Sequence, residues 1–276
     1  MHLNIAFSTC PNDTFMFDAL VHHRVDTRGF EFTSVMEDIE DLNLFAATGE
    51  PDLCKISYAF YPFLSRDYQL LTSGSALGYG NGPLLVSRLK IYPDEVQDLC
   101  VVIPGERTTA NTLLSVFYPG IKEKKTGLFS DIEEMVFSGE ADAGVLIHET
   151  RFTYEKRGLR LISDLGKLWE EKTGLPIPLG AIAVKRDLPD SVKKALNQLM
   201  RESVAFATQN PEASGSFVRE HAQSMEQSVC QQHIRLYVNE FSTGLNQTGR
   251  DAVSSLFTLG EQAGLLPACF EPVFVE

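Results

Sequence analysis

A short apolar run ends at a histidine in the segment Ala141-Asp142-Ala143-Gly144-Val145-Leu146-Ile147-His148-Glu149. Two of the three residues from Val145 to Ile147 are β-branched, which is typical of a strand that is buried on both faces. A histidine at the end of such a strand lies at the carboxyl edge of the sheet, where open α/β sheets bind their ligands. Because an imidazole titrates near neutral pH, His148 is a candidate proton acceptor. A structural histidine that only makes hydrogen bonds is the alternative interpretation.

The composition is that of an ordinary globular protein. The chain has 276 residues, of which 43% are hydrophobic and 22% charged, enough for one large or two modest domains. Its formal net charge of -13 repels phosphate backbones, which argues against nucleic acid as a partner. No stretch approaches the ~18 apolar residues of a membrane span. The first residues lack the pattern of a secretory signal peptide, so we expect a cytoplasmic protein.

The cysteines form neither a disulfide framework nor a zinc-binding pattern. Their number is odd, they are widely spaced, and no CxxC pair occurs. They are Cys10, Cys54, Cys100, Cys230 and Cys269. We therefore expect no metal site, and the simplest interpretation of Cys10 is a small buried thiol.

In the N-terminal part of the chain, segments with the apolar pattern of a strand alternate with segments that have the apolar pattern of a helix. Apolar residues predict strands over 3–8, 30–36 and 52–58, and a helix over 39–47. Pro11 cannot continue a helix from before it, and Asn12 or Asp13 is suited to cap a helix that starts there. The free backbone N–H groups of that helix could bind an anion, although a capped helix without a ligand fits equally well.

Lys55 and Ser57 lie on the third predicted strand, which ends in polar residues. Alternate residues of an extended strand point to the same face, so these two side chains should lie together. Lys55 could then neutralise a carboxylate. A surface salt bridge is the more common environment of a lysine and stays the alternative.

Two apolar strands are candidates for crossings between domains. The first follows the glycine-dense segment 74–83, which is not a phosphate-binding loop because it lacks the GK[ST] ending and no helix follows it. These glycines would permit a close backbone approach or a hinge before the strand over 83–87. The second crossing is the strand predicted over 176–185, which returns the chain to the first domain.

The segment between the crossings repeats the alternation of strands and helices. Further strands are predicted over 99–103, 124–129, 143–148 and 159–165. Thr108 and Thr109 precede an apolar-periodic run and mark a helix N-terminus, and from Pro189 onward the pattern is helical. We therefore expect an α/β fold of two lobes with a ligand cleft between them. Residues 1–86 and 185–276 would form the first lobe, including the terminal helices, and residues 87–184 the second.

Six motifs follow one another along the chain. They are Ser8-Thr-Cys-Pro-Asn-Asp-Thr-Phe-Met-Phe17, Lys55-Ile-Ser-Tyr58, Gly82-Pro-Leu-Leu-Val86, Ile103-Pro-Gly105 with Thr108-Thr-Ala110, Gly144-Val-Leu-Ile-His-Glu149 with Arg151-Phe-Thr-Tyr154, and Pro176-Ile-Pro-Leu-Gly180. Together they resemble the 1,4-dihydroxy-6-naphthoate synthases of the futalosine route to menaquinone. Each motif alone is weak, whereas six in order are specific.

The resemblance implies a fold like that of type II periplasmic binding proteins, used here by a cytoplasmic enzyme. It implies a small anionic substrate, cyclic dehypoxanthine futalosine, which carries a carboxylate and a sugar-derived ring. The implied reaction is a carbon–carbon lyase step that gives 1,4-dihydroxy-6-naphthoate and releases dihydroxyacetone. It needs no metal or redox cofactor, because aromatisation of the product supplies the driving force.

The resemblance also assigns roles to particular residues. The proton acceptor of the family falls on His148, which the strand pattern also singles out. The implied substrate-binding residues are Lys55, Ile56, Ser57, Thr109 and Ala110. Backbone N–H groups at the start of a helix, as at Thr109 and Ala110, could stabilise the charge that develops during the reaction. A second group of candidates with undetermined roles comprises Cys10, Asn12, Asp13, Thr14, Asn81 and Glu149.

Two other functions are compatible with the same fold. One is the related chorismate dehydratase of the same pathway, and the other is a solute-binding protein without catalytic activity. The expected absence of an export signal argues against the second. The sequence leaves the oligomeric state open, with a homodimer among the options.

Overall fold

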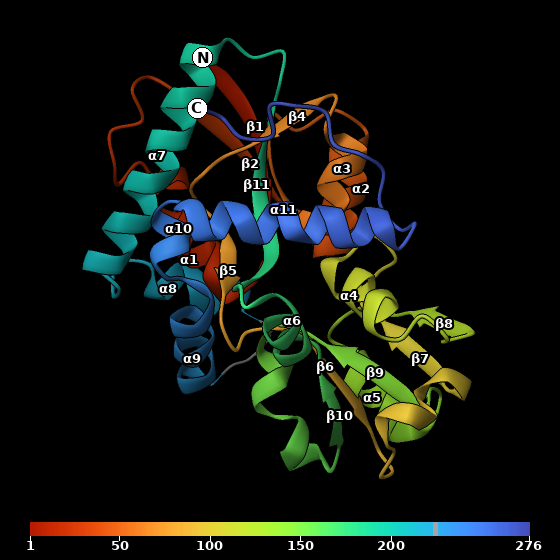
Figure 1. Cartoon of the computed structure of the whole chain (residues 1–276). Helices are drawn as coiled ribbons and strands as arrows, with labels where there is room; N and C mark the ends of the chain where they lie inside the picture. The colour runs from red at the N-terminus through yellow and green to blue at the C-terminus, as the bar shows by residue number, and fades with distance from the viewer. Residues whose placement is uncertain (223–225) are drawn as a thin grey trace.

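Two β-sheets form the centres of two lobes in the computed structural model, which describes residues 1–222 and 226–276 apart from the side chain of Glu149 (Figure 1). The first sheet consists of β1 (His2–Phe7), β2 (Glu31–Met36), β3 (Leu53–Ser57), β4 (Tyr68–Leu70), β5 (Ala76–Gly78) and β11 (Ile177–Lys185). The second consists of β6 (Leu84–Ser87), β7 (Cys100–Ile103), β8 (Glu123–Thr126), β9 (Ala143–Leu146) and β10 (Arg160–Asp164). The predicted α/β architecture of two lobes is confirmed.

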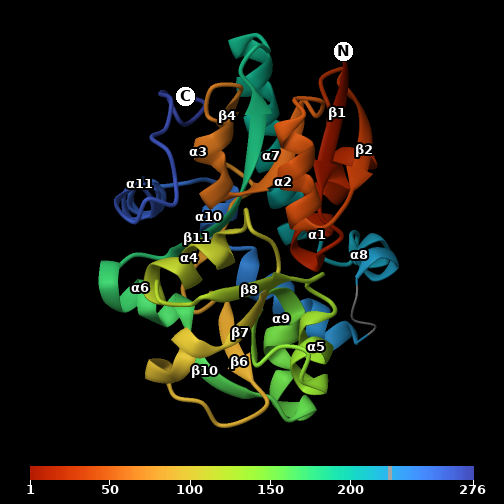
Figure 2. The same cartoon turned by 90° about the vertical axis from the view of Figure 1, so that its right-hand side faces the viewer.

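Helices cover both sheets and the junction between them (Figures 1 and 2). The α-helices are α1 (Pro11–Val21), α2 (Ile39–Ala47), α3 (Tyr61–Leu64), α4 (Thr109–Phe117), α5 (Ile132–Ser138), α6 (Leu165–Thr173), α7 (Asp190–Gln209), α8 (Gly215–His221), α9 (Gln227–Tyr237), α10 (Glu240–Thr243) and α11 (Gln247–Gln262). The 3-10 helices are η1 (Tyr58–Phe60), η2 (Pro93–Asp98), η3 (His148–Phe152) and η4 (Tyr154–Arg157). Within the described residues, none of the helices combines the length and apolar character needed to span a bilayer.

Strand β9 lies in the middle of the second sheet. It pairs antiparallel with β6 and parallel with β7, and all of its residues are buried. A Cβ atom on Gly144 would collide with Ile132 and Val136 of α5, so glycine lets this helix pack closely on the strand. The predicted strand with two buried faces is therefore confirmed, but it is shorter than expected. It ends at Leu146, and His148 begins η3.

Strand β11 completes the first sheet. It lies antiparallel between β3 and β4, and its N-terminal part also pairs with β5. Residues 177–184 thus belong to the first sheet, whereas the sequence places them in the second lobe. In the same way β6 pairs with β9 and β10 of the second sheet. The predicted boundaries at residues 86 and 185 fall inside strands, because periodicity locates a strand without saying which sheet it joins.

The C-terminal helices contact both lobes. Helices α7, α8 and α9 pack on α1 of the first lobe, and α11 packs on β11 and η1. In addition, α9 contacts η3 of the second lobe, and α11 contacts α4 of the same lobe (Figure 2). The sequence predicts packing on the first lobe alone, so the position of α9 differs from that prediction.

A continuous hydrophobic cluster joins the lobes. It includes Tyr58 and Leu70 from the first lobe and Leu85, Leu113 and Trp169 from the second, all of them buried. Burying a large apolar side chain contributes roughly 1.5–3 kcal/mol. The two lobes therefore pack against each other through apolar contacts, and the polar cavity described next lies beside this cluster.

Candidate active site

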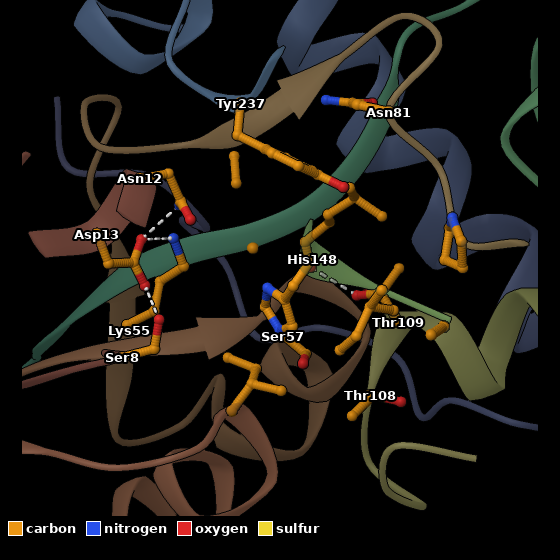
Figure 3. Close-up of a pocket in the computed structure, with 17 residues that line it drawn as sticks. Ser8, Asn12, Asp13, Lys55, Ser57, Asn81, Thr108, Thr109, His148 and Tyr237 are labelled. Atoms are coloured by element: carbon orange, nitrogen blue, oxygen red, sulfur yellow. Dashed lines mark hydrogen bonds and ion pairs between the residues drawn. The ribbon is translucent and has the colours of Figure 1, made fainter. Parts of the chain in front are cut away.

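A cavity lies between the two lobes, with about 610 Å³ that protein atoms do not fill. Its lining comes from the start of α1, from β3, from β5 and the loop that follows it, from the start of α4, from the segment after β9, from β11 and from the end of α9 (Figure 3). Both lobes thus contribute, as the sequence predicts for a ligand cleft.

His148 projects into this cavity from an unusual backbone conformation. Its φ is 59°, in the left-handed region that residues other than glycine rarely adopt. Such a conformation costs of order 1–3 kcal/mol, and it persists at functional sites where the surrounding structure holds it. Here it turns the chain sharply after Ile147, so that the imidazole lines the cavity instead of extending the strand.

Three side chains surround the imidazole of His148. The Nδ1 atom lies 3.2 Å from Sγ of Cys10, a residue that precedes α1. The ring of Phe129 meets the imidazole edge-on, with 4.7 Å between the ring centroids. The ring of His233 is stacked on the other side, with centroids 6.0 Å apart. These contacts fix the position of the ring while it stays next to the cavity.

Burial lowers the pKa of His148 to about 4. Removal from water is the main cause, the carboxylate of Asp13 opposes it, and the ammonium group of Lys55 adds to it. The imidazole is therefore neutral at pH 7, as a proton acceptor must be. Burial also keeps the pKa of His233 well below its ordinary value, so two neutral histidines lie side by side.

This pKa leads to a prediction about the pH dependence of the reaction. The neutral, basic form of His148 persists down to about pH 4, so kcat/KM should stay nearly constant from pH 7 to pH 5 and fall below that. An anionic substrate beside the ring would raise its pKa, so the acid limb of kcat should lie at higher pH than that of kcat/KM. Steady-state rates in constant-ionic-strength buffers measure both limbs. An acid limb of kcat/KM near pH 6.5 would contradict this environment for His148.

Lys55 forms a buried ion pair in the wall of the cavity. Its Nζ donates to Oδ1 of Asp13 at 2.6 Å, and the two side chains are only 4% and 2% exposed. Ser8 and Asn12 also donate to the Asp13 carboxylate, at 2.7 and 2.8 Å. The charge of Lys55 is thus neutralised inside the protein, and not by a salt bridge at the surface.

The start of α1 differs from the prediction that Asn12 or Asp13 caps it. The N-cap is Cys10, Pro11 is the first helical residue, and no side chain caps the helix. Asn12 and Asp13 lie within the first turn, where the carboxylate favourably meets the positive end of the helix dipole. Thr14 is buried and bonds back to the carbonyl of Cys10, so its hydroxyl faces the helix backbone.

Ser57 and Ile56 lie on opposite faces of β3. Ser57 lines the cavity together with Lys55, in agreement with the strand geometry. Its hydroxyl accepts a hydrogen bond from Asn43 at 3.1 Å, which leaves its own proton available to a ligand. The side chain of Ile56 is fully buried in the hydrophobic cluster, away from the cavity. Of the three adjacent residues expected to bind substrate, the structure thus brings two side chains to the cavity.

The start of α4 lines the cavity through Thr108, Thr109 and Ala110. Thr108 caps the helix by accepting from the backbone of Asn111, as the sequence predicts for this helix start. The hydroxyl of Thr109 donates to the carbonyl of Leu179 at 2.8 Å and accepts from the backbone of Ala59 at 3.2 Å. Because this side chain already has partners, a ligand would use the backbone N–H groups of the first turn.

The helical tail contributes two residues that the sequence analysis missed. Tyr237 lines the cavity, and His233 donates from Nε2 to Oδ1 of Asn12 at 2.8 Å. Both lie on α9, and their rings are 4.5 Å apart. Their spacing of four residues on one helix face is a sequence signal, but it does not reveal that this face reaches a cavity formed by earlier parts of the chain. The side chain of Glu149 lies outside the described part of the chain.

The described residues contain no group of three or more histidine, cysteine, aspartate or glutamate side chains suited to a metal ion. The polar groups around the cavity are instead hydroxyls, amides, backbone N–H groups and one neutralised ion pair. Such a set binds and orients an organic ligand, and the neutral imidazole adds a proton acceptor.

The chain matches a family described as menaquinone biosynthesis over residues 3–262. It belongs to this family. Two curated members of similar length are named 1,4-dihydroxy-6-naphthoate synthase. The Thermus thermophilus enzyme is 44% identical over 273 residues, which is 99% of each chain. The Streptomyces coelicolor enzyme is 43% identical over 272 residues, which is 96% of this chain and 95% of its own. This member of the menaquinone biosynthesis family is therefore a biosynthetic enzyme.

Solved structures show the same fold. A protein from Archaeoglobus fulgidus has a TM-score of 0.91 and 33% identity, and the alignment covers 96% of this chain and 98% of that one. The alkanesulfonate-binding protein SsuA from Xanthomonas axonopodis, bound to MOPS, has a TM-score of 0.74 and 12% identity over 99% of this chain and 97% of its own. At such low identity the second match concerns the fold alone. The fold is that of periplasmic binding proteins, as predicted.

Proposed function

We propose that this enzyme is a carbon–carbon lyase that converts cyclic dehypoxanthine futalosine to 1,4-dihydroxy-6-naphthoate with release of dihydroxyacetone. The names of the two curated relatives support the product, and the description of the family supports the pathway. The observation that carries the proposal is a neutral imidazole, that of His148, at a cavity between two lobes. The resemblance in sequence includes the motif that carries this histidine.

The cavity residues suit the chemistry of the proposed step. Breaking a carbon–carbon bond beside a carbonyl or hydroxyl group requires removal of a proton and stabilisation of the charge that develops. His148 would take the proton, a contribution of about 10²–10⁴-fold to the rate. The positive end of the α4 dipole, at Thr109 and Ala110, would attract the negative charge of the substrate and, more weakly, the charge that develops at the reacting bond. Formation of an aromatic ring makes the step favourable.

The carboxylate of the substrate would bind near Ser57 and the start of α4. The Ser57 hydroxyl has a proton to donate, and the first turn of α4 has free backbone N–H groups. Lys55 is a less direct partner, since its ammonium group is already paired with Asp13. It would add a weaker electrostatic attraction across the same wall. A cytoplasmic location agrees with a small metabolite as substrate.

Turnover of the defined substrate tests this proposal. Purified protein would be mixed with cyclic dehypoxanthine futalosine, and the aromatic product followed by absorbance and by mass. We expect turnover without added metal or nicotinamide, and unchanged turnover after treatment with EDTA. Chorismate serves as the control substrate, because its dehydration would indicate the related dehydratase instead. Tight binding of the futalosine compound without any product would favour a solute-binding protein and contradict the proposal.

A further inference from the structure

Asn81 is a buried side chain of the cavity lining, and its amide has no partner among residues 1–222 and 226–276. Its exposed fraction is 0%, and it lines the space between the lobes. Neither Nδ2 nor Oδ1 makes a hydrogen bond within the part of the chain that the structure describes. A buried donor or acceptor without a partner is costly, so native proteins rarely keep one unless a ligand or water satisfies it.

The backbone around Asn81 is held in place by the second lobe. The N–H of Gly80 donates to the Glu170 side chain at 2.7 Å, and the carbonyl of Gly82 accepts from Arg151 at 2.9 Å. Gly82 also packs directly on the backbone of Gly166, where a Cβ atom would come within 2.3 Å. The backbone that carries Asn81 is therefore fixed before any ligand arrives, which reduces the entropic cost of binding.

Two other asparagines have hydrogen-bond partners of the kind that Asn81 lacks among the described residues. Asn239 donates to the carbonyl of Leu77 at 2.8 Å and accepts from the backbone of Phe241 at 3.0 Å. Asn43 uses both ends of its amide on Ser57, at 3.1 and 2.8 Å. These two amides stabilise the fold. Asn81 has the same chemistry and the same burial as Asn43, but its hydrogen-bonding capacity is unused.

The chemistry of an amide restricts the group that it can bind. Nδ2 donates and Oδ1 accepts, so a full complement must both accept and donate. A carboxylate only accepts and would leave Oδ1 without a partner. A hydroxyl group, or two neighbouring hydroxyls, satisfies both atoms. Figure 3 shows Asn81 across the pocket from Thr108. Thr108 precedes α4, and the substrate carboxylate would bind at the start of that helix.

We propose that Asn81 determines specificity by binding the hydroxyl groups of the sugar-derived ring of the substrate. This assignment rests on the proposed function. It further states which part of the substrate binds to each side of the cavity. The carboxylate end lies near the start of α4, and the hydroxyl-bearing end lies near Asn81. His148 lies between these two regions in the same view, where the bond to be broken would be placed (Figure 3).

The test compares Asn81→Leu and Asn81→Asp with the wild type. Leucine has a similar shape and no polar atoms, so Asn81→Leu should raise KM for cyclic dehypoxanthine futalosine at least tenfold. Asn81→Asp keeps the acceptor, loses the donor and adds a negative charge, so its KM should rise at least as much. Binding of 1,4-dihydroxy-6-naphthoate, which lacks the sugar-derived ring, should change less than twofold in Asn81→Leu.

Thermal unfolding separates this role from a structural one. Because the Asn81 amide makes no hydrogen bond with the described residues, Asn81→Leu should unfold at the same or a higher Tm. Asn43→Leu is the matched control, and its Tm should fall because two buried hydrogen bonds with Ser57 are lost.

If the wild type is active, three outcomes would overturn the assignment. An unchanged KM in Asn81→Leu would overturn the assignment of Asn81 and leave the proposed function intact. Equal weakening of substrate and product would overturn the assignment to the sugar-derived ring. A lowered Tm in Asn81→Leu that accounts for the loss of activity would make Asn81 structural. A wild type that neither binds nor converts the substrate would instead overturn the proposed function, and this assignment with it.

Discussion

Replacing His148 by asparagine is expected to lower kcat by about 10²–10⁴-fold, because the proton acceptor is lost. Asparagine is the preferred substitution here. The φ of His148 is 59°, and asparagine tolerates the left-handed region better than other residues except glycine. The variant should therefore fold normally and keep its affinity for the product. Stopped-flow or steady-state rates and circular dichroism measure the two effects separately.

The matched control for this variant is His23→Asn. His23 also has a positive φ, of 51°, but its side chain is about half exposed on the surface of the first lobe. The same substitution in the same backbone conformation should leave kcat unchanged. If His148→Asn retained more than a tenth of the wild-type kcat while remaining folded, another group would have to be the base. His148→Ala is a poorer test, since alanine at a positive φ also destabilises the protein.

Replacing Lys55 by methionine is expected to lower the free energy of unfolding by about 3–5 kcal/mol, because it leaves Asp13 buried without its cation. The two side chains are almost fully buried and 2.6 Å apart. Adding Asp13→Asn to Lys55→Met removes the unpaired charge, so the double variant should be more stable than Lys55→Met alone. Urea unfolding of the wild type, the two single variants and the double variant gives the coupling energy.

Lys185→Met is the control for this experiment. Lys185 lies on β11 and pairs with Asp52 at 3.4 Å, but the two side chains are 22% and 18% exposed. Since a partly exposed pair is worth about 1 kcal/mol or less, this variant should lose little stability. Equal losses in Lys55→Met and Lys185→Met would mean that burial does not strengthen the Lys55 pair.

The periodicity of apolar residues and the capping rules for helices were sufficient to predict several elements of this fold. Buried β9 follows from the run Val145-Leu146-Ile147, and the start of α4 follows from Thr108 ahead of an apolar pattern. The common face of Lys55 and Ser57 follows from strand geometry alone. These features depend on residues that are close in sequence, which is why local rules are enough to find them.

Other features depend on contacts between distant segments and could not be predicted in this way. Asp13 and Lys55 are 42 residues apart, and neither residue type indicates the other as its partner. His233 reaches Asn12 across 221 residues, because α9 packs on α1. The unused amide of Asn81 is visible only when every neighbouring donor and acceptor is known. The resemblance to a family suggested the proposed role of His148, whereas the positive φ of this residue is a property of the folded chain.

The order of strands in the first sheet also has a consequence for synthesis on the ribosome. β11 joins β3, β4 and β5, so β4 and β5 remain separate from the β2-β1-β3 part of this sheet until residue 185 has been translated. The second sheet uses only strands between residues 84 and 164, and its pairings span shorter sequence distances. Because domains generally fold as units while the chain emerges, the lobe that contains the N-terminus should acquire its native sheet after the other lobe.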